Sequence, residues 1–135
     1  MGLFGLFGKK KKEDQEALAA TKLIAAMMQF HQETSKDGVD SDDIPKGYGP
    51  YGLCKTNPIP TSSILGSNAY ISRLRTKDGR PIESSRIGST TAEDVTNGPI
   101  DMYRITSDGV SLGTVYICPY HKRNSGKAPE GFRLV

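Results

Sequence analysis

Two Asp-Gly pairs constrain the fold of this chain more than any other feature of its sequence. Asp78-Gly79 and Asp108-Gly109 are tight-turn signals, and each follows one strand-like run and precedes another. A pair of this kind between two such runs predicts a β-hairpin, and a polar loop separates the two hairpins. The sequence therefore predicts four strands in an antiparallel meander, over residues 68–76, 80–89, 100–106 and 110–118.

The fourth of these runs has the pattern of a central strand. Successive side chains of an extended chain point to opposite faces. Both faces then carry apolar side chains, which predicts that both are covered: Val110, Leu112, Tyr116 and Cys118 on one face, Val115 and Ile117 on the other. Near the C-terminus, Phe132 and Leu134 are available to cover an edge of the sheet.

Residues 13–34 have the composition of a helix. Good helix formers dominate, acidic residues stand at the start, and no glycine or proline follows before Gly38. Apolar side chains form a wide stripe that includes Leu23, Ile24 and Met27. We expect this helix to pack on the sheet, and a partner helix or self-association is the alternative. The predicted fold is α+β, with an N-terminal helix packed on a four- to five-stranded antiparallel meander sheet.

Composition divides the chain into an apolar and polybasic tip, a helix, a linker with a loop, and a β-rich domain, at residues 1–12, 13–34, 35–66 and 67–135. The linker begins with an acidic segment that contains four aspartates between residues 37 and 43. These aspartates lack the alternating spacing, central glycine and terminal glutamate of an EF-hand. We interpret the segment as a solvated acidic linker.

Length and charge exclude several classes of protein. The chain has 135 residues and a formal net charge of +3. This length suits one domain, and the charge is too weak to indicate a nucleic-acid partner. No run approaches the roughly 20 apolar residues that span a bilayer, and no signal peptide is visible. We expect a cytoplasmic protein, and the sequence leaves its oligomeric state open.

The two cysteines and the second histidine suggest a metal site only weakly. Cys118 and His121 have a spacing that allows both to bind one zinc ion, with Cys54 as a third ligand. A structural zinc site usually needs four ligands, so we expect a buried free thiol at Cys118 and neither a metal nor a cofactor. Whether Cys54 and Cys118 form a disulfide is left open by the sequence.

The N-terminal tip combines apolar and cationic residues. Two Leu-Phe pairs separated by glycine are followed by four consecutive lysines. Apolar side chains that insert into a membrane, together with lysines beside anionic lipid, give weak and reversible membrane association. This composition favours attachment to an anionic membrane, at the inner membrane surface, through Leu3, Phe4, Leu6, Phe7, Lys9, Lys10, Lys11 and Lys12. The alternatives are a disordered start and a segment packed on the domain.

Three residues in the predicted sheet, with a histidine just after its fourth strand, suggest an alternative, enzymatic function. Glu83, Arg86, Arg104 and His121 supply a carboxylate base, arginines for a phosphate and a histidine acid. Their order, after a helix, resembles that of the small microbial ribonuclease family. This resemblance implies metal-independent RNA cleavage with Glu83, Arg104 and His121. Glu83 and Arg86 are three positions apart, however, and point to opposite faces of a regular strand.

The β-rich part also resembles a small bacterial domain without an assigned activity. The matching runs are Asn57-Pro-Ile-Pro60, Arg86-Ile-Gly-Ser89, Asp101-Met-Tyr103, Tyr120-His-Lys122 and Ala128-Pro-Glu-Gly-Phe132. A polar, aromatic and cationic patch of this kind suits a protein or peptide partner better than nucleic acid. The sequence thus predicts a binding module, with its ligand contacted by Arg86, Ser89, Tyr103, Tyr120, His121 and Lys122.

Overall fold

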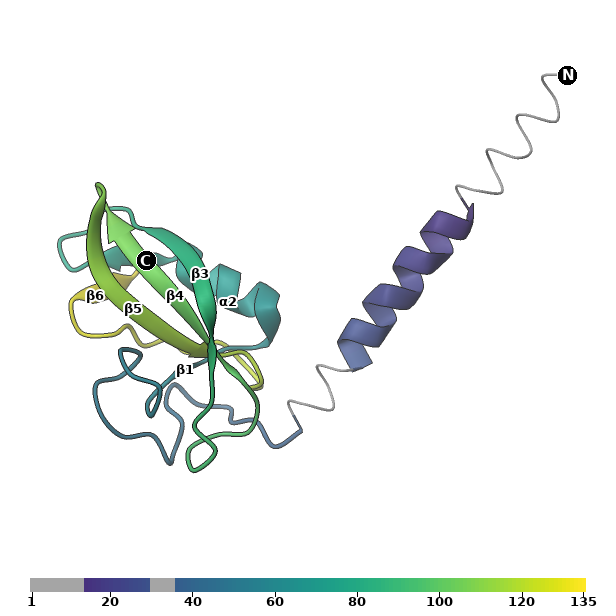
Figure 1. Cartoon of the computed structure of the whole chain (residues 1–135), viewed down its shortest axis with the longest axis horizontal. Coiled ribbons are helices and arrows are strands. Elements are labelled where there is room, and N and C mark those ends of the chain that lie inside the picture. The colour runs from purple at the N-terminus through teal and green to yellow at the C-terminus, as the bar shows by residue number, and fades with distance from the viewer. Residues whose placement is uncertain (1–13, 30–35) are drawn as a thin grey trace, which may run out of the picture. The chain divides into compact units, whose positions relative to one another are not determined.

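The computed structural model describes residues 14–29 and 36–135. The chain divides into two compact units, Met1–Glu33 and Thr34–Val135. In the first unit, residues 14–29 form a helix (Figure 1). Its described side chains are all exposed. The prediction of an N-terminal helix is confirmed over these residues, and its packing on the sheet stays a prediction. Within the described residues, no helix combines the length and the apolar character needed to cross a membrane.

The second unit contains a mixed four-stranded sheet in the order β1-β5-β4-β3 (Figure 1). Asp108 and Gly109 form the turn between the last two strands, with φ angles of 50° and 76°. Glycine adopts such angles freely and aspartate tolerates them, so this pair favours a hairpin. Three strands form the predicted antiparallel meander: β3 (Glu83–Thr90), β4 (Ile100–Ser107) and β5 (Val110–Cys118).

The fourth strand of the sheet differs from the prediction. β1 (Ile59–Pro60) runs parallel to β5, with Ile59 opposite Ile117. The sheet is therefore mixed and mostly antiparallel, and the meander includes only three of its strands. A two-residue strand shows no alternation of side chains by which the sequence would reveal it. Because β1 and β4 flank β5, the prediction of a central strand over 110–118 is confirmed.

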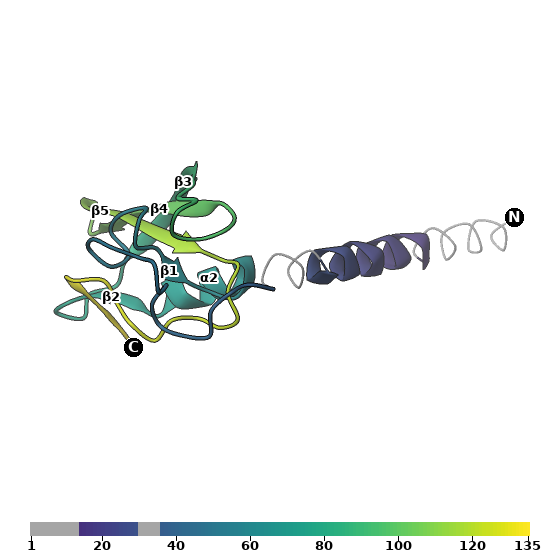
Figure 2. The same cartoon turned by 90° about the horizontal axis from the view of Figure 1, so that it is seen from below.

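A helix replaces the first predicted strand. The prediction of a strand over 68–76 is wrong, because α2 (Ser63–Ser72) occupies most of it and only β2 (Leu74–Thr76) is extended. The buried side chains of α2 are three and four positions apart, which is a helical spacing. The apolar residues that suggested a strand thus lie on one helical face, and α2 lies along one face of the sheet (Figure 2).

Ser63 begins α2 with an unusual backbone conformation. Its φ is +72°, an angle that residues other than glycine rarely adopt. The Ser63 Oγ accepts a hydrogen bond from the Gly66 N–H at 3.3 Å and so caps the first turn. The Ser63 N–H donates to the Pro119 carbonyl at 2.9 Å. These bonds hold the turn between β1 and α2 beside the end of β5.

Two apolar clusters lie on opposite faces of the sheet. Because neighbouring residues Ile117 and Cys118 belong to different clusters, the C-terminal half of β5 is covered on both faces. The prediction is wrong for the other half, where Val110 and Leu112 are exposed and a bulge breaks the alternation of side chains. The cluster beneath α2 contains Ile59, Tyr70, Ile71, Leu74, Tyr103, Ile105, Val115 and Ile117. The cluster on the opposite face contains Ile44, Ala92, Val95, Ile100 and Cys118.

A second sheet joins α2 to the end of the chain. β2 pairs antiparallel with β6 (Phe132–Leu134), and Leu74 lies opposite Leu134. Phe132 and Leu134 also pack against the cluster beneath α2. The two C-terminal side chains that the sequence offers as an edge cover therefore belong to this two-stranded sheet.

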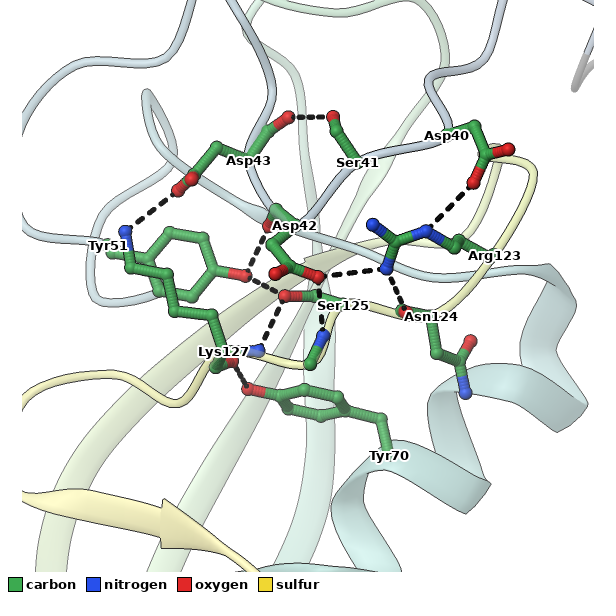
Figure 3. Close-up of polar contacts among 11 residues, drawn as sticks. Asp40, Ser41, Asp42, Asp43, Tyr51, Tyr70, Arg123, Asn124, Ser125 and Lys127 are labelled. Carbon is green, nitrogen blue, oxygen red and sulfur yellow. Dashed lines mark hydrogen bonds and ion pairs between the residues drawn. The ribbon is translucent and has the colours of Figure 1, made fainter.

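The acidic segment at residues 37–43 contacts the C-terminal part of the chain (Figure 3). Arg123 donates hydrogen bonds to Asp40 and Asp42, each at 2.8 Å. The Gly126 N–H donates to Asp42 at 2.8 Å. The Gly126 bond, and then the Arg123 bond, lower the pKa of Asp42. The segment predicted to be a solvated linker therefore lies in the second unit, and three of its four aspartates pair with cations: Asp40, Asp42 and Asp43.

Two tyrosines connect this contact to α2 (Figure 3). The Tyr51 hydroxyl lies 2.6 Å from the Ser125 Oγ, and the Lys127 Nζ lies 4.5 Å from the centre of the Tyr51 ring. Tyr70, from α2, donates a hydrogen bond to the Lys127 carbonyl at 2.7 Å. Lys127 also pairs with Asp43 at 2.9 Å. The acidic segment, the C-terminal tail and α2 are thus joined in one network.

Candidate functional site

The edge strand β3 brings together several of the predicted binding residues. Arg86 lies opposite Tyr103 on β4, and Ser89 lies opposite Asp101. Directly opposite residues share a face of a sheet. A β-bulge between Arg86 and Gly88 shifts the register by one residue. Arg86 and Ser89 therefore share a face, although residues three apart on a regular strand point to opposite faces.

An ion pair fixes Arg86 on this face. The Arg86 Nη2 donates to the Asp101 Oδ1 at 3.0 Å, and the two side chains are 55% and 11% exposed. This is the single hydrogen bond or ion pair of the Arg86 side chain within the described part of the chain. A guanidinium carries five N–H donors. Because the Arg86 side chain is mostly exposed and makes one described bond, it has donors left for a partner.

Two tyrosines lie near this ion pair: Tyr103, which is predicted to contact a ligand, is buried in the cluster beneath α2, and Tyr120 is half-buried. Burial raises the pKa of Tyr103 and of Tyr120, and the negative charge of Asp101 raises both pKa values further. The charge of Arg86 acts on both phenols in the opposite direction. Both hydroxyls therefore remain protonated at neutral pH, where they can donate hydrogen bonds. We call this group the Arg86 surface: Arg86, Ser89, Asp101, Tyr103 and Tyr120.

His121 lies beside a small cavity after the end of β5. The residue is 4% exposed. Its Nδ1 accepts a hydrogen bond from the Val39 N–H at 2.9 Å, and its Nε2 lies 3.4 Å from the Thr96 Oγ1. Burial lowers the pKa of His121 to about 4. The imidazole is therefore neutral at pH 7, and the acceptor role of Nδ1 places its proton on Nε2.

The cavity has a volume of about 240 Å³ and includes Tyr120 and His121 in its lining. Two carboxylates, Asp37 and Glu93, and one cation, Lys46, also line it. Because the charged side chains that line it have opposite signs, the cavity has no strong preference for an anion or a cation. Its most distinctive feature is the neutral imidazole, which contacts the chain on both sides of the ring.

The thiol beside His121 has no feature of an activated nucleophile. The Cys118 Sγ lies 3.7 Å from the Thr96 Oγ1, and the residue is fully buried. Burial raises the pKa of Cys118, so the thiol stays protonated at neutral pH. Cys54 is a separate free thiol, whose Sγ lies 3.4 Å from the Pro50 carbonyl. Among the described residues, no group of three or more histidines, cysteines and carboxylates is placed to hold a metal.

The structure does not bring the predicted catalytic residues together. Glu83, at the start of β3, lies opposite Thr106 near the end of β4. Thr90, at the end of β3, lies opposite Ile100 at the start of β4. The start of β4 also pairs with the end of β5, which His121 follows. His121 therefore lies at the same end of the sheet as Thr90. Glu83 and Thr90 are separated by seven strand positions, or roughly 23 Å at about 3.3 Å per residue. Arg104 lies on β4 opposite Ser85, closer to Glu83 than to His121.

The other predicted binding residues have different environments. Lys122 is exposed, and its N–H donates to the Val39 carbonyl at 3.0 Å. Together with the bond between Val39 and His121, this contact makes the chain after β5 part of the cavity wall. The predicted membrane-contact residues between Leu3 and Lys12 lie outside the described residues.

Sequence reasoning missed two residues of these sites, Asp101 and Thr96. Asp101 and Tyr103 are two positions apart on β4, so strand periodicity predicts that they share a face. Its pairing with Arg86 depends on the register of β3 against β4, which the sequence does not show. Thr96 lies in a polar loop and has no pattern that would distinguish it.

Comparison of this chain with protein-family models, with curated proteins and with solved structures found no match.

Proposed function

We propose that this protein is a binding module that its N-terminal helix attaches to an anionic membrane surface. The observation that carries the proposal is the exposed apolar face of residues 14–29. Leu23, Ile24, Met27 and Met28 are each between 58% and 63% exposed. They lie three and four positions apart or next to one another, so they form one stripe along the helix. An exposed stripe of this kind is typical of a surface that binds a partner or a membrane.

The sequence that precedes the helix favours a membrane as the occupant of this stripe. Lys9 to Lys12 lie immediately before it, and two Leu-Phe pairs precede the lysines. Each lysine near an anionic leaflet contributes about 1 kcal/mol of attraction. Stable attachment needs two signals, such as an apolar anchor and a polybasic patch, and this segment contains both. A membrane is the occupant that would contact the lysines and the apolar stripe together.

Binding, and not catalysis, is the activity that we propose for the second unit. The Arg86 surface presents a cation whose side chain is 55% exposed, the exposed Ser89 and the half-buried Tyr120, which are groups that recognise a polar partner. The alternative of ribonuclease-like cleavage needs a carboxylate and a histidine on opposite sides of one phosphate. Glu83 and His121 lie at opposite ends of the sheet, so the geometry favours the binding function.

Flotation with phospholipid vesicles tests the attachment. We expect the full chain to float with vesicles that contain phosphatidylserine and to float poorly with neutral vesicles. Leu23→Gln with Met27→Gln places two polar side chains in the apolar stripe and keeps good helix formers. Loss of about 1 kcal/mol for each side chain lowers the membrane partition at least tenfold.

The matched control for this experiment is Ala25→Gln with Ala26→Gln. It adds two glutamines on either side of Lys22, on the side of the helix opposite the stripe. We expect the control to float like the unchanged chain. Equal recovery of the stripe variant and the unchanged chain would show that the stripe does not contact lipid, and the proposed attachment would then be rejected.

A further inference from the structure

The outer edge of β3 is open within the described part of the chain. β3 pairs with β4 on one side, and the sheet ends there. Outside the ladders of the sheet, no backbone hydrogen bond of the described residues involves positions 83–90. In a strand at an edge, alternate N–H and C=O groups point away from the sheet and pair readily with another extended chain. Six of the eight side chains of β3 are also exposed, so nothing described covers this edge.

Cations lie beside this edge on both faces of the sheet. Arg86 is on one face, where Asp101 holds it by one bond and its side chain is 55% exposed. Arg104 is exposed on the opposite face, beside Ser85. Within the described residues, Arg104 makes no side-chain hydrogen bond or ion pair. Ser85 is small, so little of this face is covered between Arg104 and the open edge.

We propose that β3 binds an acidic peptide in an extended conformation, which adds to the sheet as a further strand. Neighbouring residues of such a strand point to opposite faces. The peptide residue opposite Arg86 then shares the face of Arg86, and the next one shares the face of Ser85 and Arg104. Two consecutive carboxylates therefore meet one arginine each. This inference rests on that part of the proposed function which assigns partner binding to the second unit.

Glu83 sets the register of the bound peptide. It lies on the face of Ser85 and Arg104, two positions before Ser85, and is exposed. Like charges directly opposite one another are destabilising, whereas opposite charges contribute favourably. An acidic peptide residue opposite Glu83 is therefore disfavoured and a lysine is favoured. The bulge that follows Arg86 disrupts the regular edge there, so the four residues from Glu83 to Arg86 provide the ladder.

The probe that follows from this register is a capped peptide with the sequence Thr-Val-Glu-Glu-Val-Lys-Val-Thr. Its two glutamates reach the two arginines, and its lysine reaches Glu83 when the strands are antiparallel. The control peptide has Gln-Gln in place of Glu-Glu. Binding of the fluorescently labelled peptides is measured by anisotropy, with the full chain and without vesicles. Failure of membrane attachment therefore leaves this measurement unaffected.

We expect Arg86→Gln and Arg104→Gln each to weaken binding of the glutamate peptide at least fivefold. Lys55→Gln, which removes an exposed cation from another loop, should leave binding unchanged. Arg86→Gln leaves the mostly buried Asp101 without its partner, so its fold must be checked by thermal melting. Arg104→Gln breaks no described contact and keeps the test valid if Arg86→Gln does not fold.

Strand addition is tested separately from charge. Methylation of alternate peptide nitrogens removes the hydrogen bonds of a ladder and keeps both carboxylates. We expect one of the two alternating patterns of methylation to abolish binding and the other to be tolerated. Four results would each overturn the proposal. Two concern the peptides: the two methylated peptides bind equally well, or the glutamine peptide binds as tightly as the glutamate peptide. The other two are an equal loss of binding in all three protein variants and no binding of the glutamate peptide.

Discussion

Replacing Tyr70 with alanine is expected to lower the free energy of unfolding of the second unit by about 3–5 kcal/mol. Tyr70 is 2% exposed and is among the largest fully buried side chains of the described residues. Its ring packs in the cluster beneath α2, and its hydroxyl donates to the Lys127 carbonyl at 2.7 Å. The substitution therefore leaves a cavity and removes a hydrogen bond together. Urea denaturation followed by far-ultraviolet circular dichroism measures the change.

Two further variants separate the contributions of Tyr70. Tyr70→Phe removes only the hydroxyl and should cost about 1 kcal/mol. Ala69→Ser changes the neighbouring, exposed position of α2 and should alter stability by about 0.5 kcal/mol or less. If Tyr70→Ala is no more harmful than Ala69→Ser, Tyr70 is not buried and the packing of α2 on the sheet is wrong.

Acid is expected to destabilise the second unit through His121. The pKa of His121 is lowered from 6.5 to about 4 in the folded chain. Between these values the unfolded chain binds more protons than the folded chain, so stability falls as the pH falls. The contribution of His121 is complete above pH 6.5 and is lost as the pH falls towards 4. The loss over this window is about 3 kcal/mol, at about 1.4 kcal/mol for each unit of pKa.

The measurement is urea denaturation at pH 7 and at pH 4.5, with His121→Gln as the comparison. Glutamine retains an acceptor for the Val39 N–H and does not titrate. We expect the unchanged chain to lose at least 2 kcal/mol more than the variant between the two pH values. Parallel loss of stability in the two proteins would mean that His121 titrates in its ordinary range and is not enclosed by Val39 and Thr96.

The hairpin between β4 and β5 was predictable because its turn is local. The hairpin predicted at Asp78-Gly79 is wrong, because β2 pairs with β6 and not with β3. A chain reversal needs residues that tolerate positive φ, and Asp108 and Gly109 have it. The strands on either side then follow from their alternation, which is why the central strand was predicted with both faces covered. The residues that specify these elements are close together in the sequence, so no knowledge of distant contacts is needed.

α2 was missed because its apolar residues also fit a strand. Tyr70, Ile71 and Leu74 are few and closely spaced, and a short apolar run does not distinguish the two structures. The buried Ser67, which completes the helical spacing, is polar and gave no signal. The parallel pairing of β1 depends on a contact between residues 58 positions apart, Ile59 and Ile117, which no local pattern specifies.

The candidate site was partly predictable for the same reason. Arg86, Ser89, Tyr103 and Tyr120 were selected as a patch, and the structure places them around Asp101. Their common face depends on a bulge that shifts the register by one residue, and strand periodicity alone predicts opposite faces for Arg86 and Ser89. His121 was selected as a surface residue and is buried, because its ring accepts a bond from a backbone N–H that lies 82 residues away.

The acidic segment shows a further limit of composition. Aspartates in a turn-rich segment indicate a solvated linker when their partners are unknown. Asp42 instead receives bonds from Arg123 and Gly126, which lie more than 80 positions further along the chain. The charges of the segment were visible in the sequence, and their pairing was not.

Hydrogen exchange of the full chain, with and without vesicles that contain phosphatidylserine, tests the central claim most directly. The account predicts rapid exchange of the amides of residues 14–29 in solution, because a short helix with an exposed apolar stripe opens readily. On vesicles, the same amides should exchange much more slowly, while the strands of the second unit remain unchanged. Slow exchange of residues 14–29 in solution, with no change on vesicles, would show that protein already covers the apolar stripe and would contradict the account.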